Sequence, residues 1–269
     1  MPEITVLGDF VIDPKYDAKK DVLDSVEQLR KELNKEISCI NSIDNPIMQL
    51  ICMFSLIDCM AQEWANYPVR DSKSTFCNFV LKHQSKCDYL DKVEPVTLYY
   101  RVEDLIEKTV QIPGFPPEKE ISLEALCDFD MTPIEGIIKS NKAKELLDYI
   151  ENKKGIDFAK QKENEHKLIS LIYRMRSKVT HEMTCLGQES RLKEYQLTEP
   201  YYRNIGRMYV LNKEIVTDDV YELVIPNAFI LGILNDCIDG YLNECLEQCR
   251  VPFSNNQMTR KYRLTWYDK

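Results

Sequence analysis

The chain has 269 residues, of which 44% are hydrophobic and 29% are charged, and its net charge is −9. This apolar content suffices for a buried core, which excludes a mostly disordered protein. Only 8 residues are glycine, about 3% against a usual ~7%, and their spacing excludes both the dinucleotide-binding glycine motif and the P-loop.

The first half of the chain predicts helices. Residues 3–7 suggest a short strand, and 17–38 form an amphipathic helix with an apolar stripe of Val22, Val26, Leu29, Leu33 and Ile37. A helix is expected from about Asn45 to Trp64. Because it is nearly apolar, we expect it in the centre of the fold. Two more helices are predicted. One runs over Ser74–Leu81 with Ser74 as its N-terminal cap, and the other runs over Val96–Val110.

The middle of the chain contains the clearest break. Three prolines and a glycine at 113–117 predict a loop, because proline and glycine do not continue a helix. The helical pattern resumes over 121–127 and 133–152, with Pro133 in the first turn, and a long helix is expected over 157–184.

The last part of the chain predicts a β-hairpin and one more helix. Residues 200–211 and 215–225 are rich in Tyr, Val and Ile and flank Asn212-Lys213, a pattern typical of a hairpin. Pro226 ends the second strand and precedes a helix over about 227–249. The sequence therefore predicts a mainly α protein with three parts: a strand and helix extension at 1–44, a helical domain at 45–250 that includes the hairpin at 200–225, and a tail at 251–269.

No stretch of about 18 uncharged apolar residues is present, which predicts no membrane span. The opening Met-Pro-Glu-Ile-Thr carries an acid where a secretory signal needs basic residues, so we expect a cytoplasmic protein with reduced cysteines. Cys77, His83 and Cys87 have a spacing that allows a zinc site, but C-x-x-C is absent and only 3 residues are His. We therefore expect neither a metal nor a cofactor.

The charge is unevenly distributed. Residues 139–178 carry eleven basic and six acidic side chains, a segment of +5 that leaves −14 elsewhere. The total charge argues against binding nucleic acid over the whole surface, whereas the basic segment is compatible with a site that handles a polyanion. A solvated lysine-rich helix face explains the pattern equally well.

The candidate functional residues lie on the predicted helix that contains residues 168–183. At about 100° per residue, its apolar residues share one side: Leu168, Ile172, Met175, Val179 and Met183. Arg174, Ser177 and His181 form a polar stripe on the opposite side, while Arg176 lies at the edge of the apolar one. His181 is therefore expected on the surface. Tyr173 and Tyr201 can stack on unpaired bases, although packing is the usual role of tyrosine.

Arg176-Ser-Lys-Val-Thr-His181 matches R-x4-6-H, the signature of the HEPN superfamily, and the chain resembles that family. The apolar helix at Ile51–Met60 and the segment that begins at Ser74 are similar to its first core helices, so the resemblance covers roughly 45–185. It implies a HEPN-like helical bundle. Many members are metal-independent endoribonucleases of defence, toxin and RNA-processing systems.

The resemblance implies a site that cleaves RNA through its own 2′-hydroxyl, with Arg176 and His181 as catalytic residues. Histidine, with an ordinary pKa near 6.5, can act as base and acid, and arginine can stabilise charge on the phosphoryl oxygens. Arg174-x6-His181 also fits the signature and lies on the histidine's stripe, so either arginine is a candidate. Strongly active members often have Asn, Asp or His after the arginine, where this chain has Ser177, which puts full activity in question.

Further residues support the site in this interpretation. Lys178 and Arg174 can hold phosphates, and Asp58 can orient His181 or an arginine, although a position facing solvent is slightly favoured for it. Because one chain supplies one suitable histidine, we expect a homodimer that joins two motifs, with single-stranded or looped RNA as substrate and an inhibitory or antitoxin partner. Two alternatives remain: a catalytically inactive HEPN-like module that binds RNA or protein, and a helical protein unrelated to RNA.

Overall fold

A computed structural model provides the structure of the chain. It describes residues 6–7, 10–11, 18–65, 71–85, 87–101, 133–139, 144, 148, 164–182, 198–204, 207–211, 214–218 and 221–253. The predicted loop at 113–117, the predicted helix at 121–127 and most of the predicted tail lie outside these residues. Within them the fold is mainly helical with a small antiparallel hairpin, as the sequence predicts.

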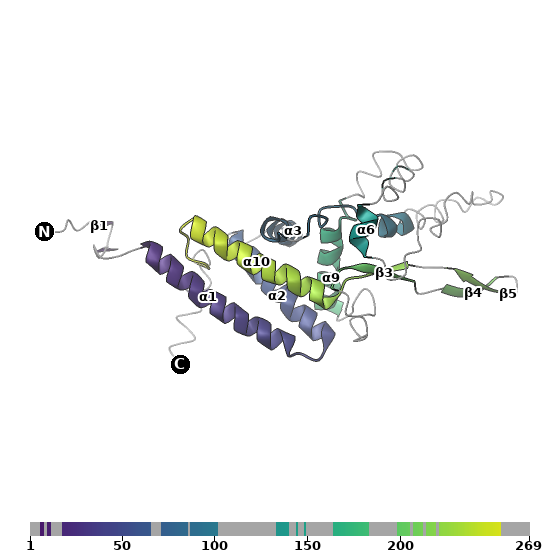
Figure 1. Cartoon of the computed structure of the whole chain (residues 1–269), viewed down its shortest axis with the longest axis horizontal. Coiled ribbons are helices and arrows are strands. Elements are labelled where there is room, and N and C mark those ends of the chain that lie inside the picture. The colour runs from purple at the N-terminus through teal and green to yellow at the C-terminus, as the bar shows by residue number, and fades with distance from the viewer. Residues whose placement is uncertain are drawn as a thin grey trace.

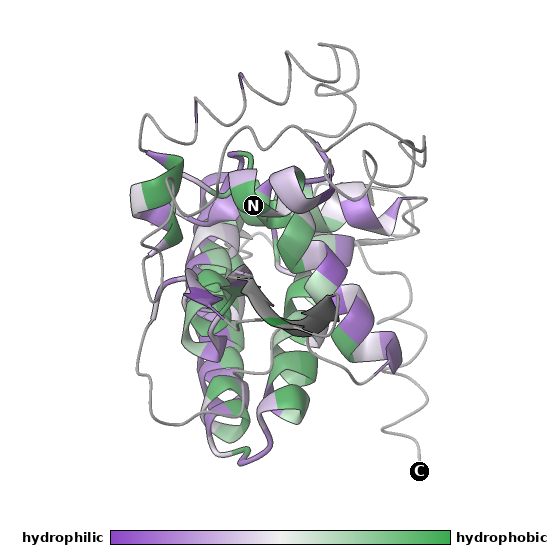
Figure 2. Ribbon diagram, turned by 90° about the vertical axis from the view of Figure 1, so that its right-hand side faces the viewer, coloured by the Kyte–Doolittle hydropathy of each residue, from purple (hydrophilic) through white to green (hydrophobic). Residues whose placement is uncertain are grey.

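The helices are α1 (Ala18–Asn41), α2 (Pro46–Trp64), α3 (Ser72–His83), α6 (Ile134–Ile138), α9 (Leu168–Glu182) and α10 (Asn227–Glu247), and residues 95–101 are also helical. The helices α1, α2 and α10 run side by side (Figure 1). Helix α3 packs on α2 and α10, and α9 packs on α2 and α3. Along these ribbons hydrophobic and hydrophilic segments alternate, as expected for helices with one buried side (Figure 2).

The central helix α2 begins and packs as its sequence predicts. Its first residue is Pro46, and the Asn45 side chain accepts hydrogen bonds from the backbone N–H of Ile47 at 3.0 Å and of Met48 at 3.1 Å. The cap satisfies two N–H groups that have no partner inside the helix. The buried residues of α2 are Leu50, Met53, Phe54, Ile57, Met60, Ala61 and Glu63.

Helix α1 belongs to the same hydrophobic core. Four residues of its predicted stripe, Val22, Val26, Leu33 and Ile37, are buried in one cluster with residues of α2 and α10, and Leu29 packs partly against it. The amphipathic spacing therefore identified the buried side of this helix correctly. None of the helices among the described residues is long and apolar enough to cross a membrane.

Two predicted helix starts and one predicted helix end differ from the structure. The cap of α3 is Asp71, which accepts from Lys73 N–H at 3.0 Å and Ser74 N–H at 3.1 Å, and not Ser74. Pro133 precedes α6 as its cap residue because it forms a β-bridge with Tyr201. Helix α6 ends at Ile138, so the predicted helix at 133–152 is interrupted at Lys139.

The long helix predicted over 157–184 begins later than expected. Residues 164–167 are not helical, and α9 starts at Leu168. The reason is tertiary: Val93 and Lys167 form a β-bridge, Leu168 N–H donates to the Lys92 carbonyl at 3.0 Å, and Ile169 N–H donates to that of Leu90 at 2.9 Å. These bonds use N–H groups that a longer helix would bond internally.

The two strands on either side of Asn212-Lys213 pair as the sequence predicts. Strands β4 (Arg207–Leu211) and β5 (Glu214–Asp218) are antiparallel, with Leu211 opposite Glu214, so Asn212-Lys213 connects them. Strands β3 (Tyr201–Asn204) and β6 (Tyr221–Val224) continue the pairing toward the helices, and β4 and β5 extend away from them (Figure 1). At the N-terminus, β1 (Val6–Leu7) pairs with β2 (Phe10–Val11), where one strand was expected.

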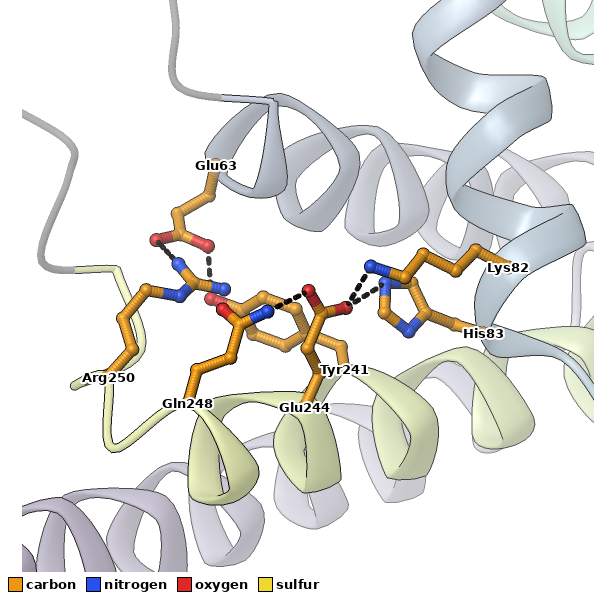
Figure 3. A network of polar contacts seen from close by, with 7 residues as sticks. All are labelled: Glu63, Lys82, His83, Tyr241, Glu244, Gln248 and Arg250. Carbon is orange, nitrogen blue, oxygen red and sulfur yellow. Dashed lines mark hydrogen bonds and ion pairs between the residues drawn. The ribbon is translucent and has the colours of Figure 1, made fainter.

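A polar network joins the ends of α2, α3 and α10 inside the fold (Figure 3). The buried carboxylate of Glu63 accepts from Tyr241 and, at 2.9 Å, from Arg250, which follows α10. Glu244 forms an ion pair with Lys82 at 2.8 Å, and its Oε2 lies 3.2 Å from Nε2 of the buried His83. Burial lowers the pKa of His83, an effect that Glu244 partly opposes. Within the network, the buried Glu63 carboxylate has an opposite charge and a hydroxyl donor beside it, which lowers the cost of burying it.

Glu94 caps the helical residues 95–101 from a fully buried position. Its two carboxylate oxygens accept from the N–H of Val96 at 2.8 Å and of Thr97 at 2.7 Å. Desolvation outweighs these hydrogen bonds and raises the pKa of Glu94 to about 7.

The raised pKa predicts a pH-dependent stability. The folded state favours the protonated carboxyl of Glu94. Its contribution to the free energy of unfolding is therefore complete below the ordinary glutamate pKa of 4.5 and is lost as the pH rises through 7. We expect Glu94→Gln, which keeps an acceptor but does not titrate, to gain up to about 3 kcal/mol relative to wild type between about pH 4.5 and pH 8. Urea unfolding of wild type and Glu94→Gln across this pH range measures the difference in their free energies of unfolding. A constant difference between the two proteins would contradict the assignment.

Candidate functional site

Helix α9 buries the side that its sequence predicts. Leu168, Ile172, Met175 and Val179 are all at most 2% exposed. They pack where α9 meets α2 and α3. Met183, the last residue of the predicted stripe, lies outside the described residues. The core therefore fixes which side of α9 faces outward.

Four polar residues of α9, namely Arg174, Ser177, Lys178 and His181, lie away from its buried stripe. His181, in the last turn, is exposed, as are Arg174 and Lys178, and Ser177 is half-buried. The prediction that His181 lies on the surface is confirmed. Arg174 reaches back along its own helix, where Nη2 donates to the backbone carbonyl of Glu165.

Arg176 turns toward α2 and binds Asp58. Its Nε donates to Asp58 Oδ2 at 2.7 Å, and its Nη2 donates to the same oxygen. The two side chains are 17% and 15% exposed, so the expectation that Asp58 faces solvent is wrong. Burial raises the pKa of Asp58, and the arginine partly opposes this shift. The alternative role, in which Asp58 orients an arginine, matches this geometry.

One further residue, Tyr173, contacts the guanidinium. The Arg176 Cζ atom lies 5.6 Å from the ring centre of Tyr173, one turn earlier on α9. The Tyr173 hydroxyl is 3.0 Å from Ser72 Oγ at the start of α3, and its ring packs on Phe76. Our sequence analysis missed Ser72. The i, i+3 spacing of Tyr173 and Arg176 is the one signal that could have linked that pair.

One copy of the chain does not place Arg176 and His181 on the same side of α9. Five helical residues correspond to a rotation of about 140° and a rise of about 7.5 Å. Arg174 and His181 are nearly aligned, at about 20°, but about 10.5 Å apart along the helix axis. The structure thus brings Arg176 together with Asp58, and it leaves His181 on the open surface of the helix.

Among the described residues, no group of three or more His, Cys, Asp or Glu side chains is arranged to hold a metal ion. Cys77, His83 and Cys87 do not form the zinc site that their spacing allows, and His83 instead faces Glu244. The eight cysteines that the structure describes are free thiols, and burial raises the pKa of Cys77 to about 11. A thiol with a raised pKa is a poor nucleophile at neutral pH.

The described part of the chain thus defines a helical protein with an exposed histidine and an anchored arginine on one helix. Comparison with protein-family models, with curated proteins and with solved structures found no match.

Proposed function

We propose that the protein is a metal-independent endoribonuclease of the HEPN type. The position of His181 carries this proposal: it is exposed in the last turn of α9, five residues after an arginine that Asp58 anchors, with the core on the helix's other side. An accessible imidazole and a fixed guanidinium are side-chain types that metal-free cleavage of RNA uses.

The reaction that these groups support is transfer of the phosphoryl group within the RNA. The ribose 2′-oxygen attacks the adjacent phosphorus, the bond from phosphorus to the 5′-oxygen breaks, and a 2′,3′-cyclic phosphate forms. A base takes the 2′-hydroxyl proton, and an acid gives a proton to the departing 5′-oxygen. Arginine N–H groups stabilise the charge on the two remaining phosphoryl oxygens.

A second copy of the chain supplies the second histidine in this proposal. Because Arg176 and His181 diverge on one helix, a site that uses both is more easily completed across a two-fold axis. The exposed Arg174, Lys178 and His181 then face the RNA or the other copy. Light scattering that finds only monomers at the assay concentration would contradict the composite site.

A specific observation favours a second candidate, a HEPN-like module that binds RNA or protein without cleaving it. The catalytic arginine candidate is already engaged by Asp58, and Ser177 replaces the larger polar residue seen in strongly active family members. In this module the exposed cations of α9 bind phosphates but no proton is transferred.

One experiment separates the two functions. End-labelled single-stranded RNA is incubated with the full chain in excess EDTA, and the product ends are analysed. We expect cleavage with 2′,3′-cyclic phosphate ends and no loss of rate on chelation. Bound but intact RNA would instead establish the binding module, and RNA neither bound nor cut would contradict both.

A further inference from the structure

Asp58 occupies only one edge of the Arg176 guanidinium. A guanidinium has five N–H donors in a planar fork, with two edges that can each make paired hydrogen bonds. The edge formed by Nε and Nη2 faces Asp58 Oδ2. Within the described residues, this guanidinium has no other hydrogen-bond partner, so the edge formed by Nη1 and Nη2 is available to an oxyanion.

Three helices fix the plane of this guanidinium. Asp58 comes from α2, the Tyr173 ring beneath the guanidinium comes from α9, and Ser72, which holds the Tyr173 hydroxyl, begins α3. These helices also pack on one another through the core. An arginine side chain otherwise samples many rotamers, so this arrangement decides in advance where its free edge points.

We propose that Asp58 is a positioning residue, which holds Arg176 so that the Nη1–Nη2 edge meets a phosphodiester. The inference rests on the proposed nuclease function. Asp58 is itself negative and partly offsets the guanidinium charge, so it cannot act by attracting RNA. A positioning role therefore affects kcat, whereas a role in attracting the substrate would affect KM.

The test is steady-state cleavage of end-labelled single-stranded RNA in EDTA. We expect Asp58→Asn to lower kcat by about 10–100-fold with KM changed by less than about threefold, a range typical of groups that orient a functional residue. Asp58→Glu, which restores the charge, should recover part of this loss. The matched control is Asp91→Asn, which removes an exposed carboxylate 2.8 Å from Lys167 Nζ and should leave kcat near the wild-type value.

The outcomes separate this inference from the proposed function. If wild type cleaves RNA and folded Asp58→Asn keeps the wild-type kcat, the positioning role is overturned and the nuclease stands. If wild type does not cleave RNA in EDTA, both are overturned. Circular dichroism checks the fold of each variant. Should Asp58→Asn fail to fold, Asp58→Glu decides: a kcat lowered about fivefold or more supports the proposal, and a wild-type kcat overturns it.

Discussion

Replacing Arg250 with methionine is expected to lower the free energy of unfolding by about 3–5 kcal/mol. The Glu63 side chain is 0% exposed, and Arg250 Nη1 is 2.9 Å from its Oε1. Without the arginine, the buried carboxylate keeps one hydrogen bond from a described residue, Tyr241, and no described residue places an opposite charge beside it. Leaving such a charge uncompensated is among the largest effects that one substitution can have.

Arg250 also holds the chain where it leaves α10. The backbone N–H of Arg250 donates to the Cys245 carbonyl at 2.8 Å, that of Cys249 donates to Leu246 at 3.1 Å, and Cys249 has a φ of 50°. This is the Schellman arrangement, in which glycine usually takes the left-handed position. The guanidinium lies 5.4 Å from the ring centre of Tyr241, so the substitution also removes packing.

Chemical denaturation measures the loss, with Arg30→Met as matched control. Arg30 pairs with Asp239 on the surface, with side chains 37% and 59% exposed, and exposed pairs contribute at most about 1 kcal/mol. The double variant Glu63→Met with Arg250→Met should recover much of the stability, because no buried charge is left unpaired. Equal losses for Arg250→Met and Arg30→Met would contradict the assigned role of Glu63.

The second large effect concerns Gly240, where α10 crosses α3. A Cβ atom at this position would lie 2.4 Å from the carbonyl oxygen of His83 and 3.0 Å from its Cα. These are backbone atoms, so the two helices must move apart to admit a methyl group. We expect Gly240→Ala to lower the free energy of unfolding by about 1–3 kcal/mol, although alanine in a helix interior ordinarily gains about 1 kcal/mol over glycine.

The matched control for this substitution lies two turns earlier on the same helix. A Cβ atom at Gly232 would have no atom within 4 Å, so Gly232→Ala should raise stability by up to about 1 kcal/mol. The two variants are thus expected to differ in sign in thermal or urea unfolding. If both raised stability alike, the close crossing of α3 and α10 at His83 would be wrong.

Local patterns predicted the parts of the fold that depend on neighbours in sequence. The apolar run predicted that α2 begins at about Asn45, and the spacing of apolar residues identified the buried sides of α1 and α9. The antiparallel pairing of the strands that flank 212–213 was likewise predicted. Each of these features is determined within a few residues, by capping, helical periodicity or turn formation.

The errors occurred where distant residues decide the outcome. Residues 164–167 are not helical as predicted, because the segment at 90–94 bonds to the backbone around Leu168 from more than 70 positions away in sequence. Asp58 lies on a helix that is apolar on most sides, and its orientation is set by Arg176, 118 residues later. The sequence allowed Asp58 either to orient an arginine or to face solvent, and only the structure distinguishes the two.

The measurement that tests the nuclease most directly is the rate of RNA cleavage in EDTA by His181→Ala relative to wild type, at equal concentrations of folded protein. His181 is exposed and distant from the core stripe of α9, so its removal should leave the fold intact. We expect cleavage to fall at least about 100-fold, the usual contribution of a general acid or base. A variant that cleaves RNA as fast as wild type would contradict the account.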